Sequence, residues 1–366
     1  MDSSVTDPNI NRVSNLTVTD TLTVKRGAVG VNSGFSATAG TLDMSGGSII
    51  GLAGNTANTT VHIGNGGLIM SDATLRFGWI WSGILDSPYT IRVNLAGDFT
   101  GSGTNSLDYI TTLGPRLLDL QVATRTFNIT GGTTTISPTI QNGGLTKTGA
   151  GALVLSGANT YTGPTTVDAG LLLVNGTHTG GGAYSVHGSG TLGGTGSIGS
   201  VVGVGAGGKL APGASIGTLA IGDHLTLAGG STFEWEFNSD SLTADLLNVD
   251  GDLALLGNVS LDLVDLAAPA GALPVDTKFT LISYSGDWNG GVFEDYANYS
   301  TFTSGLNEWR IRYNDVAPDL NGAFGSFVTL RVIPEPSSIV LLLAAVFGLL
   351  LRRRARFSRN RAPAYP

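Results

Sequence analysis

Residues 143–176 read GGLTKTGAGALVLSGANTYTGPTTVDAGLLLVNG. Its apolar residues stand in short alternating sets, such as Leu153 and Leu155, and the sets end at Thr-Gly, Ser-Gly or Asn-Gly turns. Alternation with a period of two residues is the pattern of a β-strand. Strands this short cannot bury an apolar face alone, so they must stack on further copies of the same unit.

The same unit recurs far outside this stretch. Residues 246–264 read LLNVDGDLALLGNVSLDLV, in which three apolar sets are separated by Asp-Gly and Gly-Asn. Glycine makes up 55 of the 366 residues, about twice its usual share of ~7%. Helical spacing is essentially missing before residue 337. We predict an all-β solenoid, a coil of strands that pair in parallel from one turn to the next. An antiparallel β-sandwich is the alternative, and it needs longer strands and clearer two-residue turns.

Four segments of residues 143–176 resemble the autotransporter-associated β-strand repeat, also called the passenger-associated transport repeat. The resemblance implies a right-handed parallel β-helix that is displayed outside the cell. Residues 207–237 resemble the segment that often follows such repeats, and Pro164 replaces a glycine that is common in the family. The matching segments are LTKTG (145–149), LVLSG (153–157), NTYTG (159–163) and TTV (165–167).

Two side chains of the repeat stand out chemically. We interpret Lys147 as a surface cation and Tyr161 as an aromatic ring stacked inside the coil, rather than as catalytic groups.

Residues 279–327 contain 11 of the 27 aromatic residues of the chain. A solenoid needs a cover over its open end, because exposed strand edges pair with other chains. We therefore predict an aromatic-rich C-terminal β cap. The alternative is an aromatic platform for sugar rings, and substitution of Trp288 and Trp309 separates the two: lost folding indicates the cap, lost glycan binding in a folded protein the platform.

The charge distribution excludes one class of partner. The chain has a formal net charge of −8, but six of its 19 basic residues follow residue 351. Residues 1–351 then carry 13 basic and 27 acidic side chains. Such a body repels phosphate backbones, so no nucleic-acid partner is expected. The chain has no cysteine, which excludes disulfides, thiolate zinc sites and a cysteine nucleophile.

The candidates for catalysis or metal binding are two acidic pairs, Glu234 with Glu236 and Asp250 with Asp252. Each pair has i,i+2 spacing, which places both carboxylates on one face of a strand. We interpret the first pair as a half-exposed strand and the second as a turn, with calcium at Asp250 and Asp252 as the alternative. The four histidines are scattered, and Asp223-His224 is a poor base–orienter pair. We predict that the chain is not an enzyme and holds no cofactor; the alternative is a polysaccharide lyase or hydrolase on a parallel β-helix.

The C-terminal tail, residues 332–360, reads VIPEPSSIVLLLAAVFGLLLRRRARFSRN. Its apolar run, residues 337–351, forms a helix of ~22 Å, which is short for the ~30 Å hydrocarbon core of a bilayer. The triplet Pro334, Glu335 and Pro336, the apolar run and the following arginines together resemble the PEP-CTERM sorting signal. The resemblance implies cleavage near the triplet by an exosortase-type protease.

The arginine cluster sets the orientation of this tail. Arg352, Arg353 and Arg354 follow the apolar run directly and would hold its end in the cytoplasm as a membrane stop. We therefore predict one C-terminal transmembrane helix, which anchors the protein transiently in the inner membrane before processing. The first twenty residues do not form a signal peptide, so we expect the true start to lie upstream or the chain to be a fragment.

These observations predict an exported protein that reaches the outer surface or the extracellular matrix. Its expected role is structural or adhesive, in a biofilm or exopolysaccharide matrix. The predicted organisation has five parts: N-terminal solenoid rungs (1–142), the β-strand repeat (143–176), further solenoid rungs (177–270), the C-terminal β cap (271–332) and the sorting signal (333–361).

Overall fold

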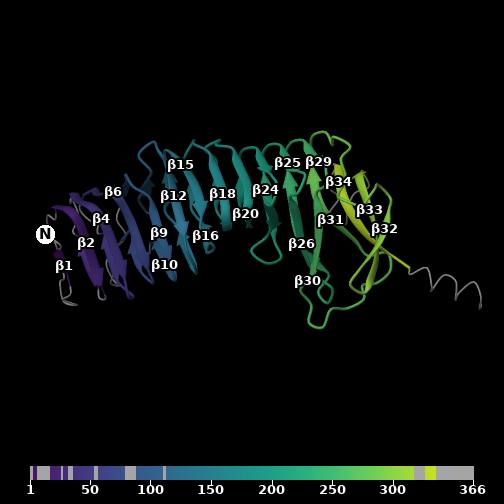
Figure 1. Ribbon diagram of the computed structural model, residues 1–366, viewed down its shortest axis with the longest axis horizontal. Coiled ribbons are helices and arrows are strands. Elements are labelled where there is room, and N and C mark those ends of the chain that lie inside the picture. The colour runs from purple at the N-terminus through teal and green to yellow at the C-terminus, as the bar shows by residue number, and fades with distance from the viewer. Residues whose placement is uncertain are drawn as a thin grey trace, which may run out of the picture.

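The computed structural model shows a long coil of β-strands that lie side by side along the molecule (Figure 1). Their order along the rod follows the chain, from the N-terminal end to a C-terminal group of antiparallel strands. Hydrogen bonds join the strands into a 25-stranded sheet and a 9-stranded sheet. The described residues are 3–5, 17–25, 28–31, 36–52, 57–78, 88–109, 113–316 and 326–334.

Along most of the coil, a strand pairs in parallel with the strand one turn later. Thr133 lies opposite Ala152, which in turn lies opposite Leu171. The series continues through Thr191 to Lys209. Partners thus stand about twenty residues apart, which is the length of one turn here. For the described residues this register establishes a parallel β-solenoid and excludes the antiparallel sandwich. The right-handed sense of the coil remains a prediction.

One turn of the coil has three faces, and the strands of each face stack on one another. Face 1 consists of β9 (Phe99–Ser102), β12 (Thr124–Ile129), β15 (Gly144–Thr148), the first halves of β18 (Thr165–Val174) and β20 (Tyr184–Gly194), β22 (Val202–Val204), β25 (Leu225–Ala228) and β29 (Leu253–Leu256). Face 2 consists of β3 (Ala28–Val31), β5 (Ile49–Leu52), β7 (Thr74–Arg76), β10 (Thr104–Asp108), β13 (Thr133–Ile136), β16 (Ala152–Leu155), the second halves of β18 and β20, β23 (Lys209–Pro212), β26 (Thr232–Asn238) and β30 (Ser260–Asp265). Face 3 consists of β8 (Ile91–Leu95), β11 (Arg116–Asp119), β14 (Thr139–Gln141), β17 (Ala158–Asn159), β19 (Thr177–His178), β21 (Ser197–Ile198), β24 (Thr218–Ile221), β28 (Leu246–Val249) and β31 (Lys278–Tyr284).

Longer strands form the N-terminal end of the coil. They pair in parallel in chain order, and two of these pairings shift register where the strands turn a corner. The last of them divides, so that its first half pairs with β8 and its second half with β9. These strands are β1 (Ser3–Val5), β2 (Thr17–Lys25), β4 (Ser36–Ser45) and β6 (Thr59–Ser71).

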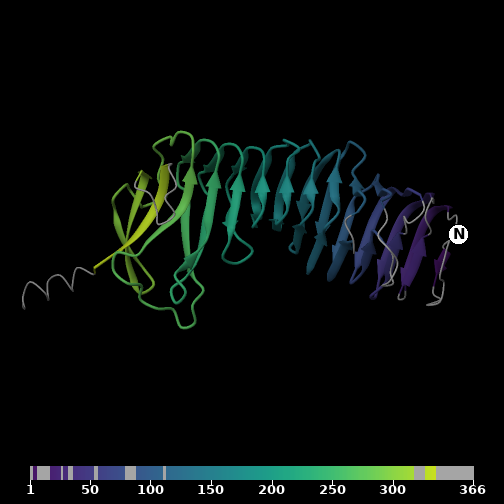
Figure 2. The ribbon, with the colours of Figure 1, turned by 180° about the vertical axis from the view of Figure 1, so that it is seen from behind.

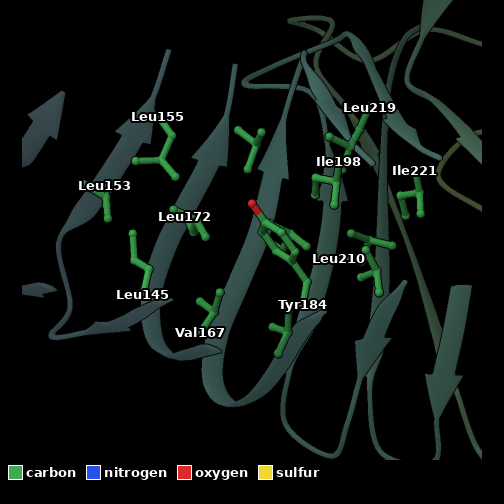
Figure 3. Close-up of a cluster of buried hydrophobic side chains, with 14 of the residues drawn as sticks. Leu145, Leu153, Leu155, Val167, Leu172, Tyr184, Ile198, Leu210, Leu219 and Ile221 are labelled. Carbon is green, nitrogen blue, oxygen red and sulfur yellow. The ribbon is translucent and has the colours of Figure 1, made fainter. Parts of the chain in front are cut away.

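Side chains alternate between the interior and the solvent, as a period of two requires. In β26 the side chains of Phe233, Trp235 and Phe237 are buried, while Glu234 and Glu236 remain partly exposed. Leucine, valine and isoleucine side chains from successive turns point into one shared interior (Figure 3). The short strands therefore gain their stability from a core that is continuous along the rod.

Gly170 shows why the corners require glycine. It lies between the two halves of β18 and adopts a φ of +68°, in the left-handed region. A Cβ atom at this position would lie 2.3 Å from the carbonyl oxygen of Gly149, one turn below. Both the backbone angle and the close stacking of turns exclude a larger residue.

Antiparallel strands close the C-terminal end of the coil (Figure 2). Strand β34 pairs with β31 on one side and with β33 on the other, and β32 completes the cap sheet. A further antiparallel hairpin joins β26 to β27. The bounds are β32 (Thr301–Ser304), β33 (Asn307–Asp315), β34 (Ser326–Ile333) and β27 (Thr243–Ala244).

The aromatic side chains near this end pack against each other. The ring of Trp309 is fully buried, with its centroid 5.6 Å from that of Phe237 in an edge-to-face contact. Trp288 stacks on Tyr313 at 5.4 Å, and its indole N–H donates to the carbonyl of Gly291. The aromatic rings thus pack the cap, and Trp309 has no surface left for a sugar ring.

No helix among the described residues is long and apolar enough to span a bilayer. The predicted transmembrane helix over residues 337–351 lies outside the described residues.

Candidate functional site

The first acidic pair lies on the outer face of β26. Glu234 forms an ion pair with Lys209 of the preceding turn, with 2.5 Å between the charged atoms. Glu234 also lies opposite Asp262 of the next turn. Partial burial raises the pKa of Glu236 above its ordinary value, and the nearby negative charge of Glu234 adds a smaller increase. The pair therefore belongs to a row of charged residues that runs along the coil. Glu234, the first residue of the pair, is already neutralised by its ion pair with Lys209.

A third carboxylate, which the sequence analysis does not single out, lies close to this pair. Asp245 is buried and accepts hydrogen bonds from the amides of Gly217 and Glu236, at 2.8 and 2.9 Å. Burial raises the pKa of Asp245 to about 7, and the charges of Glu236 and Glu234 add to this effect. The two hydrogen bonds from backbone amides act in the opposite direction and lower the pKa. Its hydrogen bonds fix the β26–β27 hairpin to the turn before β24, so its role is to position the backbone.

The second acidic pair lies at an exposed corner of the coil. Asp252 accepts from the amide of Asp287 one turn later, at 2.7 Å, and its amide donates to Nδ1 of His224. Asp250 accepts a hydrogen bond from the hydroxyl of Ser285 at 2.9 Å. The corner thus brings Asp250, Asp252 and His224 together, but each group links one turn to the next. Within the described part of the chain, no cluster of three or more His, Asp or Glu residues fits a metal ion.

Lys147 lies in the interior of the coil, so its interpretation as a surface cation is wrong. Its side chain is fully buried, and its ammonium donates to the carbonyl oxygens of Thr148, Gly149 and Ala169 at 2.8, 2.7 and 3.0 Å. Burial lowers the pKa of Lys147 to about 8, even though its ammonium donates hydrogen bonds to three carbonyl oxygens. The lysine therefore holds together two successive corners of the coil.

Tyr161 also lies inside the repeat, stacked on His178 with 4.0 Å between ring centroids. Its hydroxyl contacts the hydroxyl groups of Thr165, at 2.7 Å, and of Tyr184, at 3.3 Å. His178 donates from Nε2 to the carbonyl of Tyr161, and burial lowers the pKa of its imidazole. The burial of Tyr161 and its stacking on His178 confirm the interpretation of Tyr161 as an interior aromatic ring.

A pH dependence follows from the burial of Lys147. Between its folded pKa of about 8 and its ordinary value of 10.5, the unfolded chain holds this proton more firmly than the folded chain. The free energy of unfolding should therefore rise with pH across this window, by at most about 3 kcal/mol, and stay flat below pH 8. Urea unfolding at pH 7.5, 8.5 and 9.5 measures this change. The slope should vanish in Lys147→Met, and an equal slope in both proteins would refute the assignment to Lys147.

The outer face of the cap sheet carries a row of positive charges. Lys278 of β31 lies directly opposite Arg331 of β34, which lies directly opposite Arg310 of β33. Arg312 lies two positions along β33 from Arg310, opposite Thr329. Directly opposite residues of an antiparallel pair have Cβ atoms about 4.5–5.5 Å apart, so three adjacent strands bring three cations together.

These cations line a pocket of about 370 Å³. Asp315 is buried at the pocket and pairs with Lys278 at 3.0 Å and Arg312 at 3.2 Å. Arg331 pairs with the exposed Asp276 at 3.0 Å. Arg310 is exposed and has no ion pair with any residue that the structure describes.

The pocket lining thus has four cations and two carboxylates, on a body that is otherwise acidic. The site is not apparent from the sequence, although Arg310 and Arg312 alternate with apolar residues in EWRIRY and so share one face of a strand. Lys278 and Arg331 are brought to them only by the pairing of the cap strands.

The predicted sorting residues lie at the limit of the described chain. Pro334 is exposed and follows the last residue of β34. Glu335, Pro336 and the arginines Arg352, Arg353 and Arg354 lie outside the described residues.

The fold and the repeat together define a class: a capped parallel β-solenoid that contains a passenger-type repeat. A family model described as passenger-associated-transport-repeat matches residues 145–174, the segment from β15 to β18. This match confirms the predicted resemblance for the repeat itself. The resemblance of the tail to a sorting signal stays a prediction.

Two relatives match longer stretches of the chain. A protein of Brucella suis biovar 1 (strain 1330), named adhesin BmaC autotransporter, is 37% identical over 145 residues, which is 37% of this chain and 4% of that protein. A protein of Serratia marcescens, named extracellular serine protease, is 38% identical over 125 residues, 33% of this chain and 11% of that protein. The matched stretches therefore span only a small part of the length of these relatives.

The second relative corrects one expectation. The sequence-based prediction that the chain is not an enzyme is overturned, because a protein named a serine protease contains a similar segment. That prediction was based on the histidines and acidic residues of this chain alone. The relative is much longer than the matched stretch.

Proposed function

We propose that the chain is the extracellular β-solenoid of an exported protein, with a structural or adhesive role at the cell surface or in an exopolysaccharide matrix. The observation that carries this proposal is the stack of parallel turns with the passenger repeat inside it. Solenoids of this kind act as stiff rods with long lateral surfaces, because every turn contacts only its neighbours. The names of the two relatives, an autotransporter adhesin and an extracellular protease, support a site of action outside the cell.

Surface labelling of intact cells tests this proposal. An antibody against the folded solenoid should stain unpermeabilised cells or the surrounding matrix, and deletion of the gene should weaken attachment or biofilm cohesion. Staining that requires permeabilised cells would contradict the extracellular role.

We extend the proposal to the C-terminal tail. Strand β34 ends at Ile333 and Pro334 follows directly, so the first residue of the Pro-Glu-Pro triplet is exposed to solvent. An exosortase-type protease needs an extended, accessible segment, and two prolines favour that conformation. In this proposal the run 337–351 enters the inner membrane transiently, with Arg352–Arg354 on the cytoplasmic side.

Substitution of the triplet gives the corresponding prediction. Pro334→Ala, Glu335→Ala and Pro336→Ala together should block processing, because the recognised residues and the extended backbone are both lost. The uncut form, larger by about 30 residues, should accumulate in the membrane fraction. Mass spectrometry of the mature protein measures this, with the exposed Leu306→Ala as a control that processes normally. Normal maturation of the triple variant, or an intact tail in the mature wild-type protein, would count against the sorting signal.

An enzymatic role is the second candidate, and the name of the second relative favours testing it. Incubation with casein tests for proteolysis, and incubation with acidic and neutral glycans tests for new reducing ends or unsaturated products. Either product would assign the solenoid to an enzyme instead of a purely adhesive protein.

A further inference from the structure

We propose that the pocket on the outer face of the cap sheet binds the carboxylate groups of an acidic polysaccharide, that is, of sugar residues of the uronic-acid class. This goes beyond the structural role proposed above, which does not depend on any ligand at this pocket.

The row of cations on the cap sheet favours binding of an anion. Like charges directly opposite each other on neighbouring strands destabilise a sheet. Lys278, Arg331 and Arg310 form such a row across three strands. Asp315 is already shared between Lys278 and Arg312, and the exposed Asp276 reaches only Arg331. The repulsion is therefore relieved only in part. The guanidinium of Arg310 has no carboxylate partner among the residues that the structure describes.

The charge of the rest of the molecule limits which anion fits. Four of the 13 basic residues in residues 1–351 line this one pocket, while 27 acidic residues are spread along the same part of the chain. A long polymer with a phosphate at every step, such as a nucleic acid, would be repelled by the acidic rod that extends from the cap. A short stretch of an acidic polysaccharide that reaches no further than the pocket avoids most of this repulsion and meets four cations there.

The pocket walls match a sugar acid. Guanidinium groups bind carboxylates with two parallel hydrogen bonds, and Arg310 and Arg331 are both exposed, although Arg331 also pairs with the exposed Asp276. Tyr299 borders the pocket with 59% of its surface exposed, and the guanidinium of Arg312 lies 5.3 Å from its ring centroid. An exposed ring beside cations offers a stacking surface for the apolar face of a pyranose and a hydroxyl for hydrogen bonding. A volume of about 370 Å³ lies at the lower end of the range for small-ligand sites.

Binding of polysaccharides to the full chain tests the proposal. The probes are short alginate oligomers, in which every residue carries a carboxylate, dextran sulfate, inorganic phosphate and neutral dextran, each followed by isothermal titration calorimetry at 50 and 300 mM NaCl. We expect alginate to bind, to weaken with salt and to raise the melting temperature, and neutral dextran not to bind. Dextran sulfate and phosphate also offer anionic oxygens to a guanidinium group. Comparing them with alginate therefore shows whether the pocket selects carboxylates.

The variant Arg310→Gln/Arg331→Gln removes two cations of the row. It should weaken alginate binding about tenfold or more, because two charge-assisted contacts are lost. The matched control is Lys25→Gln, an exposed cation on β2 at the other end of the rod (Figure 1), which should bind as the wild type does. The double variant should melt at the same or a higher temperature, since it removes like charges from adjacent strands, so weaker binding cannot be a failure to fold.

Three outcomes would overturn the proposal. They are no binding of alginate to the wild type, equal binding by the double variant, and binding of dextran sulfate or phosphate without alginate, which would assign the pocket to a different anion.

Discussion

Trp309→Ala should cost the protein about 3–5 kcal/mol of its free energy of unfolding, the range for a fully buried tryptophan reduced to a methyl group. The indole lies on the inner face of β33, with no exposed surface, and contacts the rings of Phe237 and Phe279 at 5.6 and 6.2 Å between centroids. Phe237 belongs to a turn of the coil and Trp309 to the cap, so the substitution opens a cavity where the cap seals the solenoid. Urea unfolding followed by circular dichroism in the β-sheet band measures the loss.

Leu306→Ala is the matched control for this prediction. Leu306 is a large apolar residue of the same cap, but 60% of its surface is exposed. Its truncation should change the free energy of unfolding by less than about 0.5 kcal/mol. A Trp309→Ala protein that unfolds at the wild-type urea concentration would show that the cap does not seal the coil.

Lys147→Ala should destabilise the protein by about 3 kcal/mol or more. The substitution leaves the carbonyl oxygens of Thr148, Gly149 and Ala169 without the donor that joins them, and each unsatisfied buried group costs about 1–3 kcal/mol. It also creates a cavity in a turn whose neighbours are fully buried. Relief from burying a positive charge opposes these losses and sets the lower end of the estimate.

Lys147→Met separates the two contributions. Methionine keeps most of the volume of the lysine stem but cannot donate hydrogen bonds, so this variant should lie between the wild type and Lys147→Ala. Both variants are compared by urea unfolding at pH 7, where the wild-type ammonium is charged. A wild-type unfolding curve for Lys147→Ala would contradict the role of the lysine as a link between corners.

The architecture follows from short-range features of the sequence. Period-two alternation, as in Phe233, Trp235 and Phe237, predicts strands with one buried face, and glycines such as Gly170 predict the corners. Both signals are local, because side-chain alternation and positive φ angles depend on neighbouring residues alone. The repeated unit then leaves stacking as the only way to bury so many short apolar sets.

Burial of single polar residues did not follow from these local signals. Lys147 occupies an inward position of β15, and a charged residue in such a pattern is normally expected at the surface. Its burial depends on Ala169, whose carbonyl oxygen reaches the ammonium only because the coil places the next corner above it. Asp245 is similar, since its partners Gly217 and Glu236 come from other parts of the coil.

Alternation, composition and charge are enough to predict stacked β-strands with an aromatic end and an acidic body. Which charges meet depends on the folded chain, because Lys278, Arg331 and Arg310 become neighbours through the register of three antiparallel strands. Register is set by long-range pairing and by the bulges that shift it, and neither has a signature within a single strand. The strands were therefore predictable from the sequence, and the cation pocket was not.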